Sequence, residues 1–361
     1  MKNKKTYIFN CVLILALFSV FSSCTSIYNF AIEIRQPAKV TFPTDVSRIV
    51  LVNNAASPEN SDFGTECFVN QKETDCPFAI DFDSAHWASV SALAYGINSE
   101  KFFSKVMIYN VPLREDNAAL EIRPITQEVA QKIYDVTDAD AIISVEKGLF
   151  RYSQAMAQLP TGYINDPYNT FLNVKTLALF TFSVYLKDRE NPLATFSLQD
   201  SLYLKSEYVD SDSINLFRTI PNILINEVAG YIGEDAVSYF VPSWQTVDRF
   251  LFTSYNSRMK EALAYAKANK WITAENIWLE LYNSQNSLKS QAYLAQNLAV
   301  AFEMQDDLDK ALEWVQKAET LFKQDNELKN QKEINRISSY ISALTERINN
   351  DSLLNKQFGI E

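Results

Sequence analysis

The chain has few of the residues that build common catalytic and cofactor sites. Its 361 residues include only 7 glycines, 4 cysteines and 1 histidine. The glycines form neither the dinucleotide-binding nor the P-loop pattern, and the closest spacing is Gly230 and Gly233. A single histidine with few cysteines excludes most zinc sites. We therefore expect no cofactor, no metal and no enzymatic activity that depends on either.

Basic residues are also in deficit, with 33 Lys+Arg against 44 Asp+Glu and a net charge of −11. Binding to a phosphate backbone needs clustered basic side chains, so we expect no nucleic-acid partner. The 47% hydrophobic and 21% charged content is that of a chain that buries a sizeable core. The length allows two domains of roughly 100–200 residues each.

The first 23 residues have the features of an export signal. Three lysines near the start precede an apolar run at 12–21, which is shorter than the ~20 residues of a membrane-spanning helix. Two serines then lead to Cys24, an arrangement that resembles a bacterial lipoprotein signal, although Phe21 replaces the usual Leu. The resemblance implies that Cys24 becomes the lipidated first residue. The alternative is a plain signal peptide in which Cys24 is incidental.

A lipid on Cys24 would be the membrane attachment of the mature chain. Loss of residues 1–23 removes three lysines and no acids, which leaves a net charge of −14 that anionic lipids repel. No acidic cluster follows Cys24, whereas surface-exported lipoproteins of the Bacteroidota usually resemble a cysteine followed by one. We therefore expect an outer-membrane protein that faces the periplasm.

Two cysteines, Cys67 and Cys76, remain after export, separated by a polar stretch of eight residues. In an oxidising compartment two such neighbours form a disulfide, which would add about 2–3 kcal/mol of stability. The alternative is a pair of free thiols.

Strand-like and helix-like segments alternate through residues 40–240. The order strand–helix–strand–helix–strand favours parallel strands joined by right-handed crossovers. Two long strands around a short turn then predict a hairpin, and a helix follows in which Pro221 should produce a kink or a new start. We expect an α/β or α+β domain with a mixed sheet. The predicted strands are 48–54, 105–111, 139–148, 173–188 and 193–207, and the helices are 84–97, 126–137 and 214–233.

Residues 255–318 carry an internal repeat with an offset of 37. The matched pairs are Ala262/Ala299, Tyr265/Phe302, Ala274/Ala311, Trp278/Val315 and Leu281/Ala318. Small residues at fixed points let two helices approach, so the pattern resembles the tetratricopeptide repeat, with Asn269 and Asp306 where that motif usually has Gly. A further apolar stripe at 332–349 predicts a capping helix. The alternative is a plain helical bundle with accidental similarity.

These patterns divide the chain into six segments. They are a signal peptide (1–23), a tether (24–39), the α/β domain (40–240), a linker (241–254), the repeats with their capping helix (255–350) and a tail (351–361).

The whole assembly resembles a family of Bacteroidota outer-membrane lipoproteins of unknown function. The α/β part is similar, in element order alone, to the periplasmic domain shared by curli-secretion lipoproteins and lipoprotein activators of penicillin-binding proteins. Fold analogy of this kind says little about function. No functional residue can be carried over from the resemblance, because the family has no assigned site to match in this sequence.

We expect a non-catalytic adaptor whose helical repeats bind an envelope protein or peptide in a groove. The expected groove contacts lie on the first helix of each repeat and are Arg258, Glu261, Tyr265, Gln291 and Asn297.

The alternative function is a glycan- or cell-wall-binding protein or hydrolase with a site in the α/β domain near the irregular stretch 158–170. The carboxylate pairs Asp81/Asp83, Asp138/Asp140 and Asp210/Asp212 are more typical of helix caps and turns than of such a site. His86 is expected as an exposed or capping residue in the first turn of a helix.

Overall fold

The computed structural model describes residues 26–60, 63–76, 78–158, 170–206, 220–253 and 256–360. The chain divides into two compact units, which we describe separately. The sheet unit contains Pro37–Ser243 and the C-terminal residues from Leu354 onward. The repeat unit contains Trp244–Leu353 and the N-terminal residues up to Gln36.

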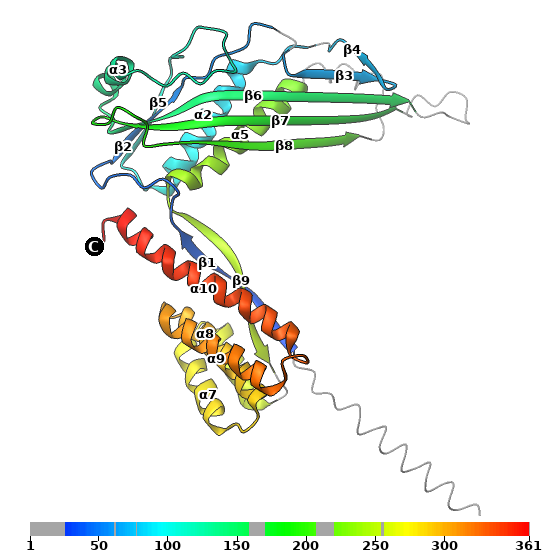
Figure 1. The fold of residues 1–361 in the computed structure, drawn as a ribbon, viewed down its shortest axis with the longest axis vertical. Helices are drawn as coiled ribbons and strands as arrows, with labels where there is room; N and C mark the ends of the chain where they lie inside the picture. Colours follow the sequence, from blue (N-terminus) through cyan, green and yellow to red (C-terminus); the bar gives the residue numbers. More distant parts are fainter. Residues whose placement is uncertain are drawn as a thin grey trace, which may run out of the picture. The chain divides into compact units, whose positions relative to one another are not determined.

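The sheet unit has the predicted strand–helix–strand–helix–strand order, followed by the long hairpin and a helix (Figure 1). Two short strands that were not predicted, Thr65–Val69 and Lys72–Thr74, lie between the first strand and the first helix in the chain. Its elements are β2 (Arg48–Asn53), β3 (Thr65–Val69), β4 (Lys72–Thr74), α2 (Phe82–Glu100), β5 (Lys105–Tyr109), α3 (Gln127–Thr137), β6 (Ala141–Gln158), β7 (Thr170–Leu186), β8 (Ala194–Ser206) and α5 (Ile220–Phe240).

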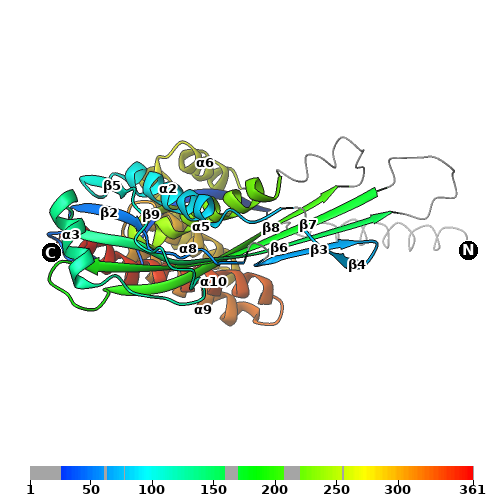
Figure 2. The ribbon, with the colours of Figure 1, turned by 90° about the horizontal axis from the view of Figure 1, so that it is seen from above.

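The sheet is mixed, as the sequence predicts. Strand β2 pairs in parallel with β5 on one side and with the first part of β6 on the other. The second part of β6 pairs in parallel with β3, and the antiparallel strands β7 and β8 follow (Figure 2). The register of β6 against β7 shifts between Val145 and Lys147, so Glu146 occupies a β-bulge.

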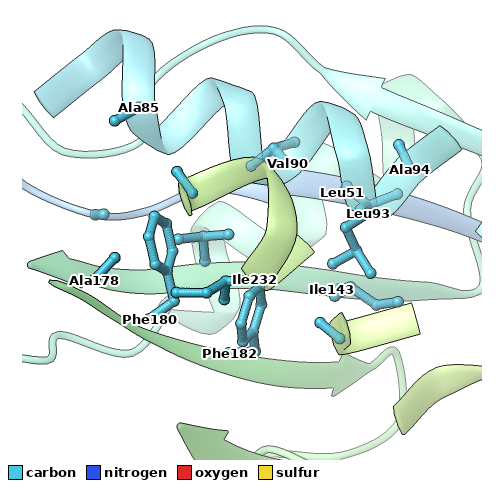
Figure 3. Close-up of a cluster of buried hydrophobic side chains, with 14 of the residues drawn as sticks. Leu51, Ala85, Val90, Leu93, Ala94, Ile143, Ala178, Phe180, Phe182 and Ile232 are labelled. Atoms are coloured by element: carbon cyan, nitrogen blue, oxygen red, sulfur yellow. The ribbon is translucent and has the colours of Figure 1, made fainter. Parts of the chain in front are cut away.

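Helices cover both faces of the parallel part of the sheet. Helices α2 and α5 pack on one face, against residues such as Leu51, Ile143 and Phe180 (Figure 3). Helix α3 packs on the other face, against Val50 and Val52. Burial on both faces explains why β2 is a continuous apolar run rather than an alternating one.

Helix α5 differs from its prediction at the C-terminal end, since it continues past Gly233 to Phe240. A Cβ atom at Gly233 would lie 2.4 Å from the backbone oxygen of Ser89, so this glycine marks a close approach of α5 to α2. Pro221 is the second residue of α5, where a missing N–H removes no helical hydrogen bond. The part of the predicted helix before Ile220 lies outside the described residues.

The described part of the repeat unit contains two helix pairs, a longer final helix and two strands. Its elements are β1 (Ser26–Gln36), β9 (Ser243–Thr253), α6 (Ser257–Lys267), α7 (Trp271–Ser284), α8 (Leu288–Glu303), α9 (Leu308–Asn326) and α10 (Gln331–Phe358). The buried small residues Ala262, Ala274, Ala299 and Ala311 let the helices of each tetratricopeptide-like pair approach.

The two helix pairs turn in the same way. Asn269 and Asp306 both adopt a left-handed conformation, with φ of 58° and 63°. The next residue donates its backbone N–H to the residue five positions earlier in both turns, from Lys270 to Tyr265 at 2.9 Å and from Asp307 to Phe302 at 3.0 Å. Asn and Asp are the residue types other than Gly that adopt this conformation most readily.

The connecting segments contain secondary structure that the sequence analysis did not predict. The tether and the linker contain strands β1 and β9, which pair in a two-stranded sheet. The tail continues helix α10 as far as Phe358. In β9 the apolar residues Phe250, Leu251 and Phe252 are consecutive and buried against the helices, so the segment lacks the alternation of a half-exposed strand.

Candidate binding sites

Asn297 is not the groove contact that the sequence suggests, because it is fully buried. Its side-chain amide accepts a hydrogen bond from the backbone N–H of Phe252 and donates one to the backbone oxygen of Phe252, both at 2.8 Å. An asparagine amide can pair with both backbone polar groups of one strand residue, because it has both an N–H donor and a carbonyl acceptor. The chain's own strand β9 therefore lies along helix α8 where an extended peptide was expected.

A buried ion pair adds to the attachment of β9. Arg249 donates two hydrogen bonds of 2.7 Å to the carboxylate of Glu303, which also accepts from Tyr340 at 2.7 Å and from Arg347 at 3.1 Å. Burial alone would raise the pKa of Glu303, but the hydrogen bonds and charges of these partners lower it. The carboxylate is thus held in its charged form between β9, α8 and α10.

The other predicted groove residues do not converge on one surface. Arg258 pairs with Glu261 on its own helix and with Glu280 on α7. Tyr265 is half-buried against the helical core. Gln291 donates a hydrogen bond of 3.0 Å to the backbone oxygen of Gln285. These contacts stabilise the helices of the repeat unit.

A cavity of 230 Å³, which we call the repeat pocket, lies among these helices, and none of the five predicted groove residues lines it. It is bounded by the start of α6, the end of α7 and the start of α8. Its lining residues are Thr253, Asn256, Met259, Leu281, Gln285, Ser290, Tyr293 and Leu294. Met259 and Leu294 are buried, and Leu281 and Tyr293 are half-buried, so the floor is apolar. Asn256, Gln285 and Ser290 supply a polar rim. Such a pocket suits an apolar side chain with a polar backbone around it.

A second cavity, of 370 Å³, lies in the sheet unit between α3 and the β7–β8 turn; we call it the hairpin pocket. Its lining residues are Ile125, Gln127, Glu128, Ala130, Gln131, Tyr134, Tyr185, Leu186, Lys187, Arg189 and Glu190. The floor of this pocket is formed by four buried residues, Ile125, Ala130, Tyr134 and Tyr185. The charged residues are exposed at the rim. Sequence analysis did not identify this site because its two sides are about 60 residues apart in the chain.

Behind the floor of the hairpin pocket lies the fully buried carboxyl of Glu146. It accepts hydrogen bonds from Tyr185 at 2.7 Å and from Asn54 at 2.6 Å. Burial raises the pKa of Glu146, although these two donors act in the opposite direction. The bulge in β6 places this side chain beside the end of β2 and orients Tyr185 at the pocket wall.

His86 is fully buried, so the expectation of an exposed or capping residue was wrong. Its Nε2 lies 3.0 Å from the backbone oxygen of Gly148, and its ring packs among Phe82, Phe150 and Phe180. Burial lowers the pKa of His86. Nothing in this arrangement presents the imidazole to a substrate.

The described carboxylate pairs have structural partners. Asp81 caps α2 by accepting a hydrogen bond of 3.0 Å from the backbone N–H of Ser84, and Asp83 accepts one of 2.8 Å from Ser57.

Asp138 and Asp140 both pair with Arg48. The hydrogen bond from Arg48 is the main reason that the pKa of Asp140 falls to about 2. Asp210, Asp212 and most of the stretch 158–170 lie outside the described residues.

Cys67 and Cys76 form a disulfide, which links β3 to the segment after β4. Cys24 lies outside the described residues. Within the described part of the chain, no helix is long and apolar enough to span a membrane. The same residues include no group of three or more His, Cys, Asp or Glu side chains that could hold a metal ion.

Solved structures give only weak likenesses. A neuraminyllactose-binding hemagglutinin homolog from Helicobacter pylori is 13% identical, with coverage of 54% of this chain and 86% of that one and a TM-score of 0.23. A DUF330 protein from Xanthomonas campestris is 9% identical, with coverage of 57% and 92% and a TM-score of 0.25. Lipoprotein GNA1162 from Neisseria meningitidis is 14% identical, with coverage of 50% and 98% and a TM-score of 0.17. At these TM-scores the likenesses support no functional argument.

Comparison with curated proteins finds no match. Two family models match the sequence itself. Residues 260–346, within the repeat unit, match a domain of unknown function, DUF6340. Residues 46–252, which run from the first strand of the sheet unit to the end of β9, match another domain of unknown function, DUF8603. Since that match covers more than half of the chain, the protein belongs to the DUF8603 family.

Proposed function

We propose that the protein is a non-catalytic lipoprotein of the bacterial outer membrane that binds a segment of another envelope protein at the repeat pocket. The signal-like residues 1–23 and the following Cys24 support lipid attachment, with the body in the periplasm. The disulfide between Cys67 and Cys76 suits an oxidising compartment. The resemblance to Bacteroidota lipoproteins favours the same location.

The repeat pocket is the observation that carries the adaptor role. Its apolar floor of Met259, Leu281 and Leu294 would take one large apolar side chain of the partner. Rim residues Gln285 and Ser290 would hydrogen-bond the backbone on either side of that side chain. Because β9 already contacts α8 at Asn297 and Glu303, the partner segment would be short and anchored at one point rather than laid along a groove.

Site-specific photocrosslinking in intact envelopes tests this proposal. A photoreactive residue at Gln285, on the pocket rim, should yield a discrete crosslinked product. The same residue at Gln316, on the exposed surface of α9, is the matched control and should not yield that product.

Ser290→Phe should fill the pocket and abolish the product without changing the melting temperature, because Ser290 is only half-buried at the rim. Cys24→Ala should release the protein from the membrane and weaken the product. Identical products from Gln285 and Gln316, or a product that survives Ser290→Phe, would refute binding at the repeat pocket.

A further inference from the structure

Strand β1 begins close to the residue that would carry the lipid. Its first residue, Ser26, is two positions after Cys24. A polypeptide spans at most about 3.6 Å per residue, so the Cα atoms of Ser26 and Cys24 are no more than about 7 Å apart. A lipid on Cys24 would therefore hold the surface around the start of β1 at the membrane, because no linker separates the two.

The turn between α6 and α7 is next to the start of β1. The Nζ atom of Lys267, at the end of α6, lies 4.1 Å from the centroid of the Tyr28 ring. Phe30 stacks on Tyr28, and it also stacks on Trp271 at the start of α7, with 5.8 Å between the ring centroids. These contacts hold the α6–α7 turn against the first residues of β1, so a lipid on Cys24 would bring this turn to the membrane as well.

The same turn exposes both kinds of side chain that bind a membrane surface. Ile272, in the first turn of α7, is 65% exposed. Lys267 and Lys270 are exposed as well, and neither forms an ion pair with a described residue. An exposed apolar side chain enters the boundary between headgroups and acyl chains, and lysines beside it attract lipid phosphates. We call these three residues, together with Tyr28, the turn patch.

The equivalent turn of the second helix pair has the opposite charge. With the offset of 37, the two lysines and the isoleucine of the turn patch correspond to Met304, Asp307 and Asp309. Both turns have the same backbone conformation, so the fold does not require basic and apolar residues in the first one. Anionic lipids would attract the first turn and repel the second, which selects one side of the repeat unit although the whole chain is acidic.

We propose that the turn patch is the face of the repeat unit that binds the phospholipid surface. Ile272 would enter the headgroup region, and Lys267 and Lys270 would pair with lipid phosphates. This role rests on the lipid attachment at Cys24 proposed above. The repeat pocket lies at the opposite ends of α6 and α7, so it would remain open to a protein partner.

Fluorescence quenching by labelled lipids tests this orientation. In the mature chain Cys24 would carry the lipid, and Cys67 and Cys76 form a disulfide, so an introduced cysteine would be the one free thiol. The lipidated chain with Ile272→Cys is labelled with a thiol-reactive fluorophore and reconstituted in vesicles of phosphatidylethanolamine and phosphatidylglycerol. Comparison of vesicles with and without a lipid that carries a nitroxide on its headgroup measures how close the label lies to the membrane surface.

Trp244→Cys is the matched control. Trp244 is a large apolar residue that is 58% exposed and lies beside a cation, with the guanidinium carbon of Arg35 5.2 Å from its ring centroid. Arg35 is nine residues from Ser26, which is about 30 Å along a strand, so this label should stay outside the headgroup region. The label at position 272 should be quenched at least about 3-fold more strongly than the label at position 244.

Two kinds of failure are distinguishable in this experiment. A chain that does not sediment with the vesicles would overturn the lipid attachment and the turn patch together. A chain that sediments with the vesicles but shows equal quenching at positions 272 and 244 would overturn the turn patch alone.

Charge reversal tests the two lysines. Lys267→Glu combined with Lys270→Glu should reduce the quenching at position 272 by at least about half, because anionic lipids would then repel the turn. Lys101→Glu combined with Lys105→Glu makes the same change in net charge at exposed positions of the sheet unit and should leave the quenching unchanged. Equal quenching in the two double variants, at unchanged melting temperatures, would overturn the pairing of the turn patch with lipid phosphates.

Discussion

Asn297 of α8 binds both backbone polar groups of Phe252 in β9, each at 2.8 Å. Both residues are buried, at 0% and 2% exposure, and they are 45 positions apart in the chain. This contact places a strand of the same chain against the part of α8 where an extended peptide was expected.

Replacing Asn297 by Ala should therefore destabilise the protein. The change leaves a buried N–H and a buried carbonyl of Phe252 without partners, which should cost about 2–4 kcal/mol. Urea unfolding measures the effect, and Gln291→Ala is the control because its side chain is half-buried and makes a single bond at the edge of the helix. Equal losses in both variants would contradict the role assigned to Asn297.

Overpacking tests the repeat geometry. Ala274→Leu and Ala311→Leu place a larger side chain at equivalent, fully buried positions and should each cost about 1–3 kcal/mol. Ala264→Leu, at an exposed position of α6, should change stability by less than about 0.5 kcal/mol. Thermal unfolding of the three variants provides the comparison. Unchanged stability in both buried variants would rule out close helix packing at the repeat positions.

Two glycines of α5 should respond in opposite directions to the same substitution. Gly233→Ala forces a Cβ atom to within 2.4 Å of the Ser89 backbone oxygen, so it should destabilise by about 1–3 kcal/mol. At Gly230 nothing lies within 4 Å of the new Cβ atom, so Gly230→Ala should stabilise by about 0.5–1 kcal/mol through helix propensity. Melting temperatures of the two variants measure the difference. Effects of the same sign would contradict the close contact between α2 and α5.

His86 should make stability depend on pH below its ordinary pKa of 6.5. Burial lowers the pKa of this imidazole in the folded protein below its ordinary value of 6.5, so the fold favours the neutral form. Its contribution to stability is fully present above 6.5 and decreases as the pH falls toward the folded-state pKa, by at most about 1.4 kcal/mol per pH unit.

Urea unfolding at several pH values, compared with His86→Gln, measures this dependence. His86 is the chain's single histidine, so the variant should lose most of the slope below pH 6.5. An unchanged slope in His86→Gln would assign the dependence to another group, such as Glu146.

Much of the fold could be predicted from local patterns. The parallel strands, the hairpin and the helix pairs follow from periodicity, and the offset of 37 locates the equivalent turns at Asn269 and Asp306. Strand β9 was missed because its run of Phe250, Leu251 and Phe252 is buried on both sides and shows no alternation. The groove residues could be assigned only to a side of their helix. Helix periodicity shows which side of the helix a residue lies on, but not which other segment packs against that side.

The two candidate pockets depended even more on tertiary structure. Tyr134 and Arg189 are 55 positions apart, and each is ordinary in its own segment. Their shared cavity exists because the pairing of β6 with β7 brings the β7–β8 turn beside α3. No sequence spacing indicates that Tyr134 and Arg189 line the same cavity.

The sequence by itself determined most of the helices, the long strands and the tetratricopeptide-like repeat, because these depend on the order and type of neighbouring residues. Only the tertiary structure decided that Asn297 holds β9, that His86 is buried and that Glu303 is enclosed by Arg249 and Tyr340. Burial and pairing of polar groups depend on residues that are distant in the chain, and they determine which side chains remain available to bind a ligand.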